Sequence, residues 1–378
     1  MRQAIEVIPV TTRAEREEFI RLPDRLHRAD PAWVPPLLVQ RRAAVDPARN
    51  PYFAHAEVQL FLARRGGRVV GRASAQVDQM AVDLHGRTGH FGLLAAEDDD
   101  DEAVAALMRA AEAFLGWRGM RRARGPFNLS VNQECGLLVD GHQTPPSVMT
   151  PHDLPHLAPA LERLGYVKAR DLLAYSVPVD AAPPPFVRRL LAGTGSDRLR
   201  LRRLDLADYH AEVARALAIF NDAWSGNWGF VPFTEDEMFA LGEEMRLVID
   251  ADLTWFAELD GRPVGMLVTL PDVNRAIRDL GGRLLPWGWL RALWRLKVGG
   301  VDAARVPLMG VRAAACGGLA AAVPFALVEA MRPHLRARGY RTVEMSWVIE
   351  DNLPMRRMAE ALGGAVAKTW RIYERDLT

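Results

Sequence analysis

The chain of 378 residues has a formal net charge of +1, and 49% of its residues are apolar and 25% charged. This length and apolar content suit two domains that each bury a core, and the balanced charge argues against a dedicated nucleic-acid-binding protein. Two cysteines far apart in the sequence and nine histidines without ligand spacing predict neither a disulfide framework nor a metal site.

The first half of the chain predicts a β-hairpin, a strand, a helix and a second strand. The hairpin is expected at Phe61–Gly71, and an apolar helix at Val104–Met120 precedes the strand Arg121–Phe127. Between hairpin and helix, the strand Thr88–Ala95 runs into six acidic residues at 97–102. These acids suit the start of a helix and repel a polyanionic ligand, so no such ligand is expected there.

The second half repeats this order. A strand, glycine turn and strand at Trp255–Gly265, an apolar helix at Val323–Tyr340 and a strand at Thr342–Val348 match the elements of the first half. In both halves a short helix then closes on Leu-Gly and a tyrosine follows ten residues later: Leu164-Gly165 with Tyr175, and Leu362-Gly363 with Tyr373. Four matches in the same order predict a duplicated unit.

These patterns predict an α+β fold of two lobes, each with a mixed, mostly antiparallel sheet and helices on both faces. The N-terminal lobe is expected at residues 1–180 and the C-terminal lobe at 198–378. Proline and glycine clusters at 181–197 predict a linker. The C-terminal lobe carries an insertion at 275–305, directly before the strand Val306–Val311.

The order of these elements resembles the GNAT acyltransferase fold. The resemblance implies that two parallel strands separate to admit the pantetheine of CoA, whose pyrophosphate is held by backbone N–H groups at the next helix start. The C-terminal lobe is expected to bind CoA, because small residues without a nearby acid follow its strand, whereas the N-terminal lobe is expected to be degenerate. Cys316 stands where the family has Arg or Gln, and Leu319 replaces a second glycine. The expected CoA-binding residues of this loop are Val311, Arg312, Ala313, Cys316, Gly317, Gly318 and Leu319.

Four segments resemble, more specifically, a bacterial family of two-lobed GNAT proteins that includes the bacterial ceramide synthases. These segments are Asp30–Leu37, Asn128–Leu138, Asn227–Pro232 and Glu344–Asn352. The resemblance covers nearly the whole chain. It implies an N-acyltransferase of bacterial sphingolipid synthesis, which joins a long-chain fatty acyl group from acyl-CoA to the amine of a sphingoid base.

Amide formation from a thioester needs a neutral amine, donors for the oxyanion and an acid for the leaving thiolate. The GNAT resemblance implies that Tyr373 is this acid and that Asn352 contacts pantetheine, although packing and an N-cap are the alternatives. Glu344 alternates with Ser346 on an apolar strand, so both are expected to face the cleft. The candidate general bases, each with a structural role as the alternative, are Glu344, Glu350 and Glu134.

Two aromatic segments are expected to bind the acceptor. The first suits a substrate lid, with core packing as the alternative, and contains Asn221, Trp224, Asn227, Trp228 and Phe230. The second, residues 284–297, mixes leucines and cations with the tryptophans Trp287, Trp289 and Trp294. This composition predicts a helix that lies on a membrane surface, and a helix packed between lobes is the alternative. With no signal peptide or apolar span, the expected location is cytoplasmic, at the periphery of the inner membrane.

Three other functions remain open at this point. A GNAT N-acetyltransferase of a small amine or peptide would use acetyl-CoA and bind no lipid. A non-catalytic protein that binds acyl-CoA or lipid would release no CoA, and the altered glycine loop favours it. A two-lobed transferase that uses aminoacyl-tRNA would need a basic face, which the balanced charge disfavours.

Overall fold

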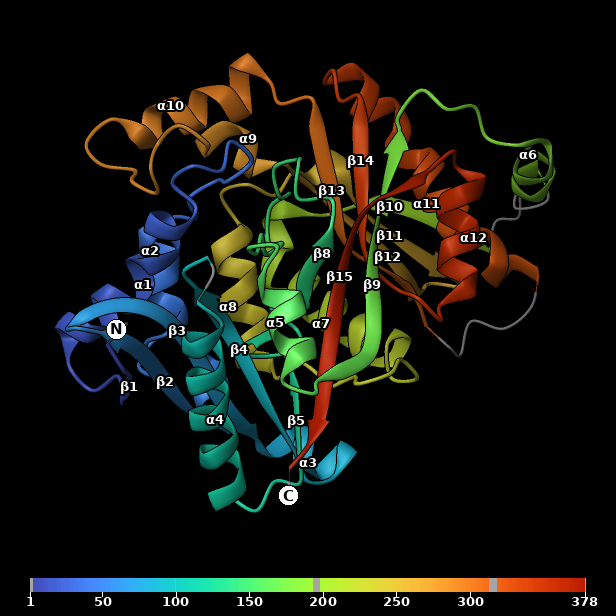
Figure 1. Cartoon of the computed structure of the whole chain (residues 1–378). Coiled ribbons are helices and arrows are strands. Elements are labelled where there is room, and N and C mark those ends of the chain that lie inside the picture. The colour runs from blue at the N-terminus through green and yellow to red at the C-terminus, as the bar shows by residue number, and fades with distance from the viewer. Residues whose placement is uncertain (1–2, 99, 193–197, 313–317, 378) are drawn as a thin grey trace. The chain divides into compact units, whose positions relative to one another are not determined.

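The computed structural model describes residues 3–98, 100–192, 198–312 and 318–377. Figure 1 shows the ribbon of the chain with its helices and strands labelled. The chain divides into two compact units. Unit 1 comprises Met1–Leu172, Arg278–Leu284 and Lys368–Thr378, and unit 2 comprises Leu173–Ile277 and Leu285–Ala367. The two units differ from the expected lobes chiefly because the C-terminal residues of the chain belong to unit 1.

Unit 1 is built on a sheet in the order β1-β2-β3-β4-β5-β15. Only β4 and β5 pair in parallel along this sheet; the other neighbours are antiparallel. The elements are β1 (Ile5–Pro9), α1 (Arg13–Leu26), α2 (Leu38–Ala44), η1 (Pro51–Ala54), β2 (Ala56–Arg65), β3 (Arg68–Asp78), α3 (Gln79–His85), β4 (Thr88–Ala96), α4 (Asp101–Trp117), β5 (Arg122–Gly125), β6 (Phe127–Asn128), β7 (Glu134–Cys135), β8 (Leu137–Asp140), α5 (Leu157–Arg163), the start of β9 (Val167–Pro178) and the end of β15 (Ala365–Asp376).

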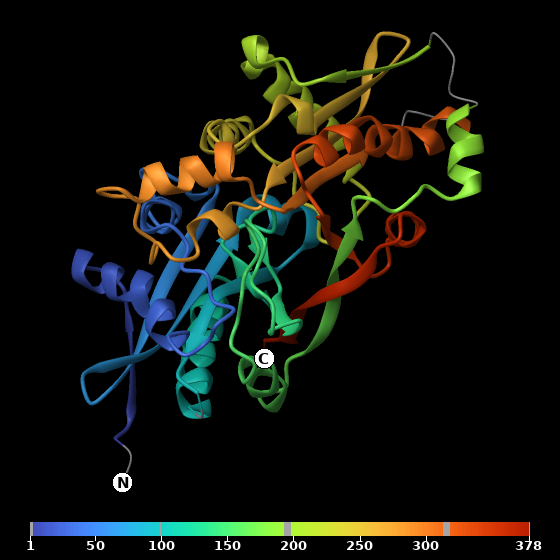
Figure 2. The ribbon, with the colours of Figure 1, turned by 90° about the horizontal axis from the view of Figure 1, so that it is seen from above.

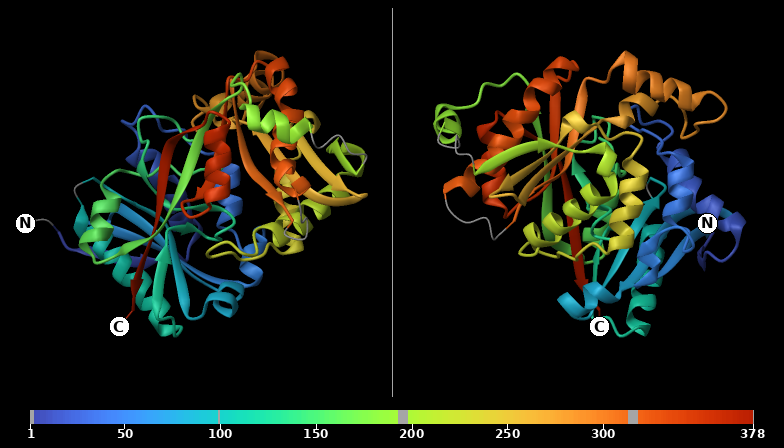
Figure 3. Two further views of the ribbon diagram at one scale, coloured as in Figure 1. Left: turned by 90° about the vertical axis from the view of Figure 1, so that its right-hand side faces the viewer. Right: turned by 180° about the vertical axis from the view of Figure 1, so that it is seen from behind.

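The two faces of the unit 1 sheet bury different helices, because side chains alternate along each strand. On β2, Phe61 and Ala63 join the core around α4, whereas Leu60 and Leu62 join the core around α1 and α2. Figure 3 shows α1 and α2 (blue) and α4 (teal) beside these strands. The sheet is therefore covered by helices on both faces, as the sequence predicts.

The acidic run before α4 is held in local contacts. Asp100 is the N-cap of α4, and its side chain accepts a hydrogen bond from Ala103 N at 3.2 Å. Arg65 lies 2.7 Å from Asp100 and 2.8 Å from Glu102, and Arg25 lies 2.6 Å from Glu97. These acids cap and position the helix, which is the role that carboxylates favour at a helix N-terminus.

Unit 2 has a sheet in the order β9-β14-β13-β12-β11-β10, in which β13 and β14 are parallel. Its hairpin β11–β12 is antiparallel to β10 on one side and to β13 on the other. The elements are the end of β9, α6 (Pro185–Ala192), β10 (Leu199–Arg203), η2 (Leu206–Asp208), α7 (Tyr209–Ala223), α8 (Glu235–Met245), η3 (Ala251–Leu253), β11 (Thr254–Leu259), β12 (Arg262–Pro271), α9 (Val273–Ile277), α10 (Gly288–Trp294), the π-helical turn η4 (Arg295–Gly299), β13 (Ala303–Val311), α11 (Gly318–Ala337), β14 (Thr342–Ile349), α12 (Leu353–Ala361) and the start of β15.

The unit 2 sheet is also covered on both faces. Phe256 and Met266 pack in the core formed with α7 and α8, whereas their neighbours Ala257 and Leu267 pack in the core formed with α11 and α12. Figure 2 shows α11 along the strands of this unit. The two-lobed α+β arrangement predicted from the repeat is confirmed.

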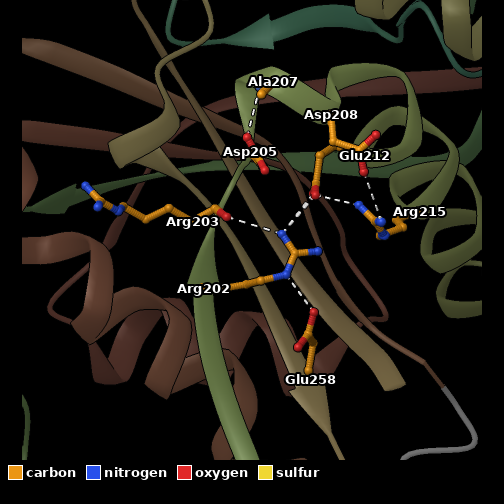
Figure 4. Close-up of polar contacts among 8 residues, drawn as sticks. All are labelled: Arg202, Arg203, Asp205, Ala207, Asp208, Glu212, Arg215 and Glu258. Atoms are coloured by element: carbon orange, nitrogen blue, oxygen red, sulfur yellow. Dashed lines mark hydrogen bonds and ion pairs between the residues drawn. The ribbon is translucent and has the colours of Figure 1, made fainter. Parts of the chain in front are cut away.

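A buried ion-pair network holds the start of α7 against the sheet of unit 2 (Figure 4). Glu212, whose side chain is 2% exposed, accepts hydrogen bonds from Arg202 at 2.9 Å and from Arg215 at 2.5 Å. Arg202 Nε also donates to Glu258 Oε1 at 2.6 Å. The network joins β10, β11 and α7, so it fixes the helix whose C-terminal end leads into the aromatic segment.

The closing strands of the two repeats are exchanged. In the sequence each half ends on its own strand, yet β15 pairs with β5 in unit 1 and β9 lies next to β14 in unit 2. Opposite charges explain why β15 pairs with β5. Arg124 lies 2.8 Å from Glu374, directly across the strand pair, and Arg122 lies 2.8 Å from Asp376. The corresponding stretch of β9 has no acid after Tyr175 and ends on a proline.

The expected linker contains a helix. α6 buries Val187 completely, and Phe186 packs edge-on against Phe325 of α11 with ring centroids 6.0 Å apart. Two prolines precede the helix, and a third, Pro185, opens it, where proline loses no helical hydrogen bond. Residues 193–197 lie outside the part of the chain that the structure describes.

Candidate functional site

The parallel strands β13 and β14 of unit 2 pair only at their beginnings. Four residue pairs join them, from Ala303↔Thr342 to Val306↔Met345. Beyond these pairs, β13 continues to Val311 and β14 to Ile349 without pairing to each other. The two strands therefore separate from each other toward their C-terminal ends, where the GNAT resemblance expects pantetheine.

A hydrogen-bonded group of three side chains lies at the point where the strands separate. Arg305 Nε donates to Ser346 Oγ at 2.9 Å, and Ser346 Oγ donates to Glu344 Oε1 at 2.7 Å. Arg305 and Glu344 lie opposite each other in register, with Nε and Oε1 3.9 Å apart. Arg305 is 2% exposed, so its permanent charge is buried with this carboxylate as a partner.

These three side chains lie on the sheet face that α7 covers. Their neighbours Ala304, Val306, Val343 and Met345 belong to the opposite core, around α11, and alternation directs Arg305 and Glu344 to the other side. The guanidinium of Arg305 also lies 5.0 Å from the ring centroid of Trp347. Arg305 is not among the site residues predicted from the sequence, although a lone arginine among apolar strand residues indicates a buried ionic partner.

The aromatic segment after α7 lies on the same face. The Trp224 ring packs against β13 so closely that a Cβ on Gly310 would lie 2.3 Å from it. Asn221 holds the segment in a loop, because its amide donates to Phe233 O at 3.0 Å and its oxygen accepts from Phe233 N at 3.0 Å. Trp224 also stacks on Phe220, with centroids 4.7 Å apart. The segment therefore borders the separated part of β13.

The expected CoA loop is described only at its edges. Val311 ends β13, Arg312 N donates to Val264 O at 2.7 Å, and α11 begins at Gly318. Ala313, Cys316 and Gly317 lie outside the described residues, as do the side chains of Gly318 and Leu319. Asn352 is the N-cap of α12, where its side chain accepts from Met355 N at 3.2 Å.

The candidate acid and bases fall in different units. Glu344 and Glu350 belong to unit 2, whereas Tyr373 and Glu134 belong to unit 1. The Tyr373 hydroxyl donates to Glu162 Oε1 at 2.9 Å, and burial together with this carboxylate raises the pKa of Tyr373. The tyrosine beside β14 in unit 2 is Tyr175, which lies in the core with its hydroxyl 3.2 Å from Glu360 Oε1.

In unit 1, the chain itself fills the corresponding opening. β4 and β5 pair from Thr88↔Arg122 to His90↔Arg124, and β5 then ends. A Cβ on Gly92 of β4 would lie 1.7 Å from Phe127 O, and Leu93 N donates to Asn128 Oδ1 at 2.8 Å. The backbone after β5 therefore occupies the space beside β4.

The insertion presents apolar side chains to solvent. Leu285 is 80% and Trp287 69% exposed, and the other exposed large apolar residues here are Trp289, Leu290, Leu293, Trp294 and Val298. Arg295 holds the segment to α9, because its Nη1 donates to Ala276 O at 2.8 Å. Across the described residues, none of the helices combines the length and apolar character needed to cross a bilayer.

Comparison with known proteins places this architecture in a family. A scan of protein-family models returns no match. The chain is 48% identical over 376 residues to the bacterial ceramide synthase of Caulobacter vibrioides, which covers 99% of this chain and 98% of that protein. The chain belongs to the bacterial ceramide synthase family. A second relative in this range, protein YghO of Escherichia coli, is 40% identical over 362 residues, or 95% of this chain and 92% of that protein.

Solved structures agree with this family at the level of the fold. A tandem GNAT protein from the clavulanic acid biosynthesis pathway aligns over 99% of both chains with a TM-score of 0.59 and 15% identity. A GCN5-related N-acetyltransferase from Sphaerobacter thermophilus aligns over 99% of this chain and 96% of its own, with a TM-score of 0.54 and 13% identity. This ceramide synthase family member is thus an N-acyltransferase with a tandem GNAT fold.

Proposed function

We propose that this protein transfers a long-chain fatty acyl group from acyl-CoA to the amine of a sphingoid base, which forms a ceramide. The observation that carries the proposal is full-length similarity to a bacterial ceramide synthase, at 48% identity with 99% of this chain covered. The separated parallel strands of unit 2 support it, because they provide the opening that the fold uses for a thioester donor. Sphingoid bases and acyl-CoA are the substrates in this proposal.

The CoA site is proposed at the C-terminal ends of β13 and β14. In this proposal the pantetheine lies beside Val311, and the pyrophosphate binds close to the start of α11 at Gly318. Arg312 adds a positive charge. The loop offers small residues and no acid, which suits close approach of phosphate to the backbone. Asn352 adds a polar side chain at the start of α12.

The acyl-transfer step needs a base, and we assign this role to Glu344. The amine of the acceptor loses a proton to Glu344 as its nitrogen attacks the thioester carbon, and the tetrahedral intermediate then expels the CoA thiolate. Ser346 and Arg305 act as positioning residues: the serine hydroxyl donates to Glu344 Oε1, and the arginine fixes that hydroxyl. Tyr373 as the acid for the thiolate, and Glu350 or Glu134 as alternative bases, stay predictions.

The acceptor is proposed to arrive from a membrane surface. Exposed tryptophans and leucines beside arginines and a lysine suit the headgroup region of a bilayer, where rings sit at the interface and cations face phosphates. The substrates support this assignment, since both carry long alkyl chains that partition into membranes. The segment Asn221–Phe233 is proposed to contact the acceptor beside β13.

The test of the function is release of CoA thiol by the purified full-length protein. Acyl-CoA donors from acetyl to long-chain are supplied with and without a sphingoid base, and products are identified by mass spectrometry. We expect release that depends on both a long acyl chain and the base, with ceramide as product. Release with acetyl-CoA alone would instead indicate a small-amine N-acetyltransferase, and absence of release with every pair would contradict the proposal.

A further inference from the structure

Three metal-ligand side chains meet in unit 1, away from the proposed acyl-transfer residues in sequence. His152 Nε2 lies 2.8 Å from Asp30 Oδ2, and His27 Nδ1 lies 3.5 Å from the same oxygen. One ligand atom from each residue lies within 4.8 Å of the other two. In the described ranges of the chain, no other group of three His, Cys, Asp or Glu side chains meets this condition.

The spacing of these atoms is close to that of a tetrahedral metal site. An ion with bonds of about 2.0–2.2 Å at tetrahedral angles holds its ligand atoms about 3.3–3.6 Å apart. The contact between His27 and Asp30 already has this length. The contact between His152 and Asp30 must lengthen by about half an ångström, which exchanges a hydrogen bond for two metal bonds.

The cluster contains a buried nitrogen that makes no hydrogen bond to the described residues, although it lies 3.5 Å from Asp30 Oδ2. His27 is 4% exposed at its side chain, and its Nδ1 has no hydrogen-bond partner among the described residues. A bound ion would give this buried nitrogen the partner that buried polar atoms normally have. Asp30 Oδ1 accepts from Ala32 N at 2.8 Å, which leaves Oδ2 for the ring nitrogens. The Asp30 side chain is 27% exposed, so an ion can reach its carboxylate from solvent.

The ligand side chains are held in place by their surroundings. His27 is the C-cap of α1, and its ring stacks on Trp33 with centroids 4.1 Å apart and planes 7° apart. Asp30 N donates to His27 O at 2.9 Å, which fixes the turn between them. Before His152, Pro151 O accepts from Trp370 Nε1 at 3.0 Å. Metal sites depend on such supporting contacts because they orient the ligands before the ion binds.

We propose that unit 1 binds one divalent first-row transition-metal ion through His27 Nδ1, Asp30 Oδ2 and His152 Nε2. Two imidazoles and one carboxylate suit zinc and its neighbours, whereas magnesium and calcium prefer oxygen ligands alone. The ion ties the end of α1 to the loop of His152, and a water from the exposed side of Asp30 takes the fourth position. The sequence alone gives no sign of the site, since Asp30 and His152 are 122 residues apart.

The test measures metal bound to the full-length protein without an affinity tag. The protein is stripped with a chelator, mixed with an equimolar amount of Zn²⁺, passed over a desalting column and analysed for zinc by mass spectrometry. We expect one zinc per chain and a higher melting temperature with zinc than with chelator, because a ligand that binds only the native state stabilises it. Cobalt in place of zinc gives the visible absorption of a four-coordinate ion.

Three variants and a matched control locate the ion. His27→Gln, Asp30→Asn and His152→Gln each remove one ligand atom while they keep a polar side chain, and each is expected to abolish binding and the thermal shift. His55→Gln changes another histidine of unit 1, whose Nδ1 lies 3.1 Å from Asp78 without a third ligand, and it should bind zinc as the wild type does. No zinc on the wild-type protein, or equal zinc on His152→Gln, would overturn the proposal. Both outcomes are independent of acyl transfer.

Discussion

Arg305 shows how one buried charge organises the residues around it. Its guanidinium meets Ser346, Glu344 and the Trp347 ring, all on the neighbouring strand β14. A charge in this position is stable only with a partner, because desolvation of an unpaired ion costs several kcal/mol. The side chain therefore holds Glu344 and Ser346 in one arrangement where the strands begin to separate.

The proposed role of Glu344 as the base can be tested by substitution. Glu344→Gln keeps the hydrogen bond from Ser346 and removes the base, so we expect kcat for ceramide formation to fall about 100-fold. KM for acyl-CoA should change little, because the residue is proposed to act on the amine. Glu350→Gln is the control and should retain most of the activity. The assignment is wrong if Glu350→Gln shows the large loss and Glu344→Gln does not.

The buried ring of His90 makes the stability of the protein depend on pH. Burial lowers the pKa of His90 to about 4, and its ring packs on Phe127 with centroids 4.7 Å apart. The unfolded chain binds a proton near pH 6.5 that the native state binds only near pH 4, so stability is present above pH 6.5 and is lost as pH falls toward 4. His27 and His152 have pKa values shifted in the same direction by burial, so they add to this loss.

The measurement compares urea unfolding at pH 7 and pH 5. We expect His90→Phe to lose about 2 kcal/mol less than the wild type over this interval, since one titrating group is removed. His210→Gln changes an exposed histidine and is the control for loss of a histidine elsewhere in the chain. If His90→Phe and the wild type lose the same free energy of unfolding between pH 7 and pH 5, His90 does not account for the loss.

At the scale of single elements, the position of α7 is stabilised by buried ion pairs as well as by apolar packing. Glu212 is almost fully buried and accepts from two arginines, one on β10 and one on α7 itself. Glu212→Gln is expected to lower the free energy of unfolding by about 2–3 kcal/mol, because both arginines lose a charged partner. Glu243→Gln removes an exposed ion pair with Arg246 on α8 and should change stability very little. Similar losses for both variants in urea unfolding would contradict the buried role of Glu212.

The helix α10 allows a test of membrane contact. Trp287→Ser together with Trp294→Ser is expected to reduce binding to anionic phospholipid vesicles at least about tenfold, because two interfacial rings are removed. Flotation with vesicles is the measurement. Trp117→Ser is the matched control, since Trp117 is 85% exposed at the end of α4 and belongs to the other unit. Equal losses for Trp117→Ser and the double variant would show that α10 does not contact lipid specifically.

At the scale of the whole molecule, the exchange of closing strands makes the end of the chain part of unit 1. Glu374→Lys with Asp376→Lys places like charges opposite Arg124 and Arg122. We expect faster amide hydrogen exchange in β5 and unchanged exchange in β14, because like charges across a strand pair destabilise it. Glu243→Lys with Glu244→Lys changes the net charge equally at exposed positions and should affect neither strand. If amide hydrogen exchange became faster in β14 instead of β5, the pairing of β15 with β5 would be contradicted.

The secondary-structure elements and their order follow from local patterns in the sequence. Hydrophobic periodicity, glycine turns and helix caps are local signals. They predict both hairpins, the helices α4 and α11 and the strands β4, β13 and β14 to within a few residues of their bounds. The family follows from motifs that are read along the chain. α6 is not predicted because a run of prolines such as 183–185 is also typical of linkers, and the helix is stabilised by Val187, which is buried in the fold.

Packing between elements selects which strand closes each unit and which polar groups meet. β9 and β15 carry similar patterns, so alternation cannot choose between them, and the choice rests on pairs such as Arg124 with Glu374 that form only across strands. The contacts of Arg305 with Glu344 and of His152 with Asp30 likewise join residues distant in sequence. Spacing along a chain reports periodicity within an element, whereas a site depends on distances between elements, which only packing sets.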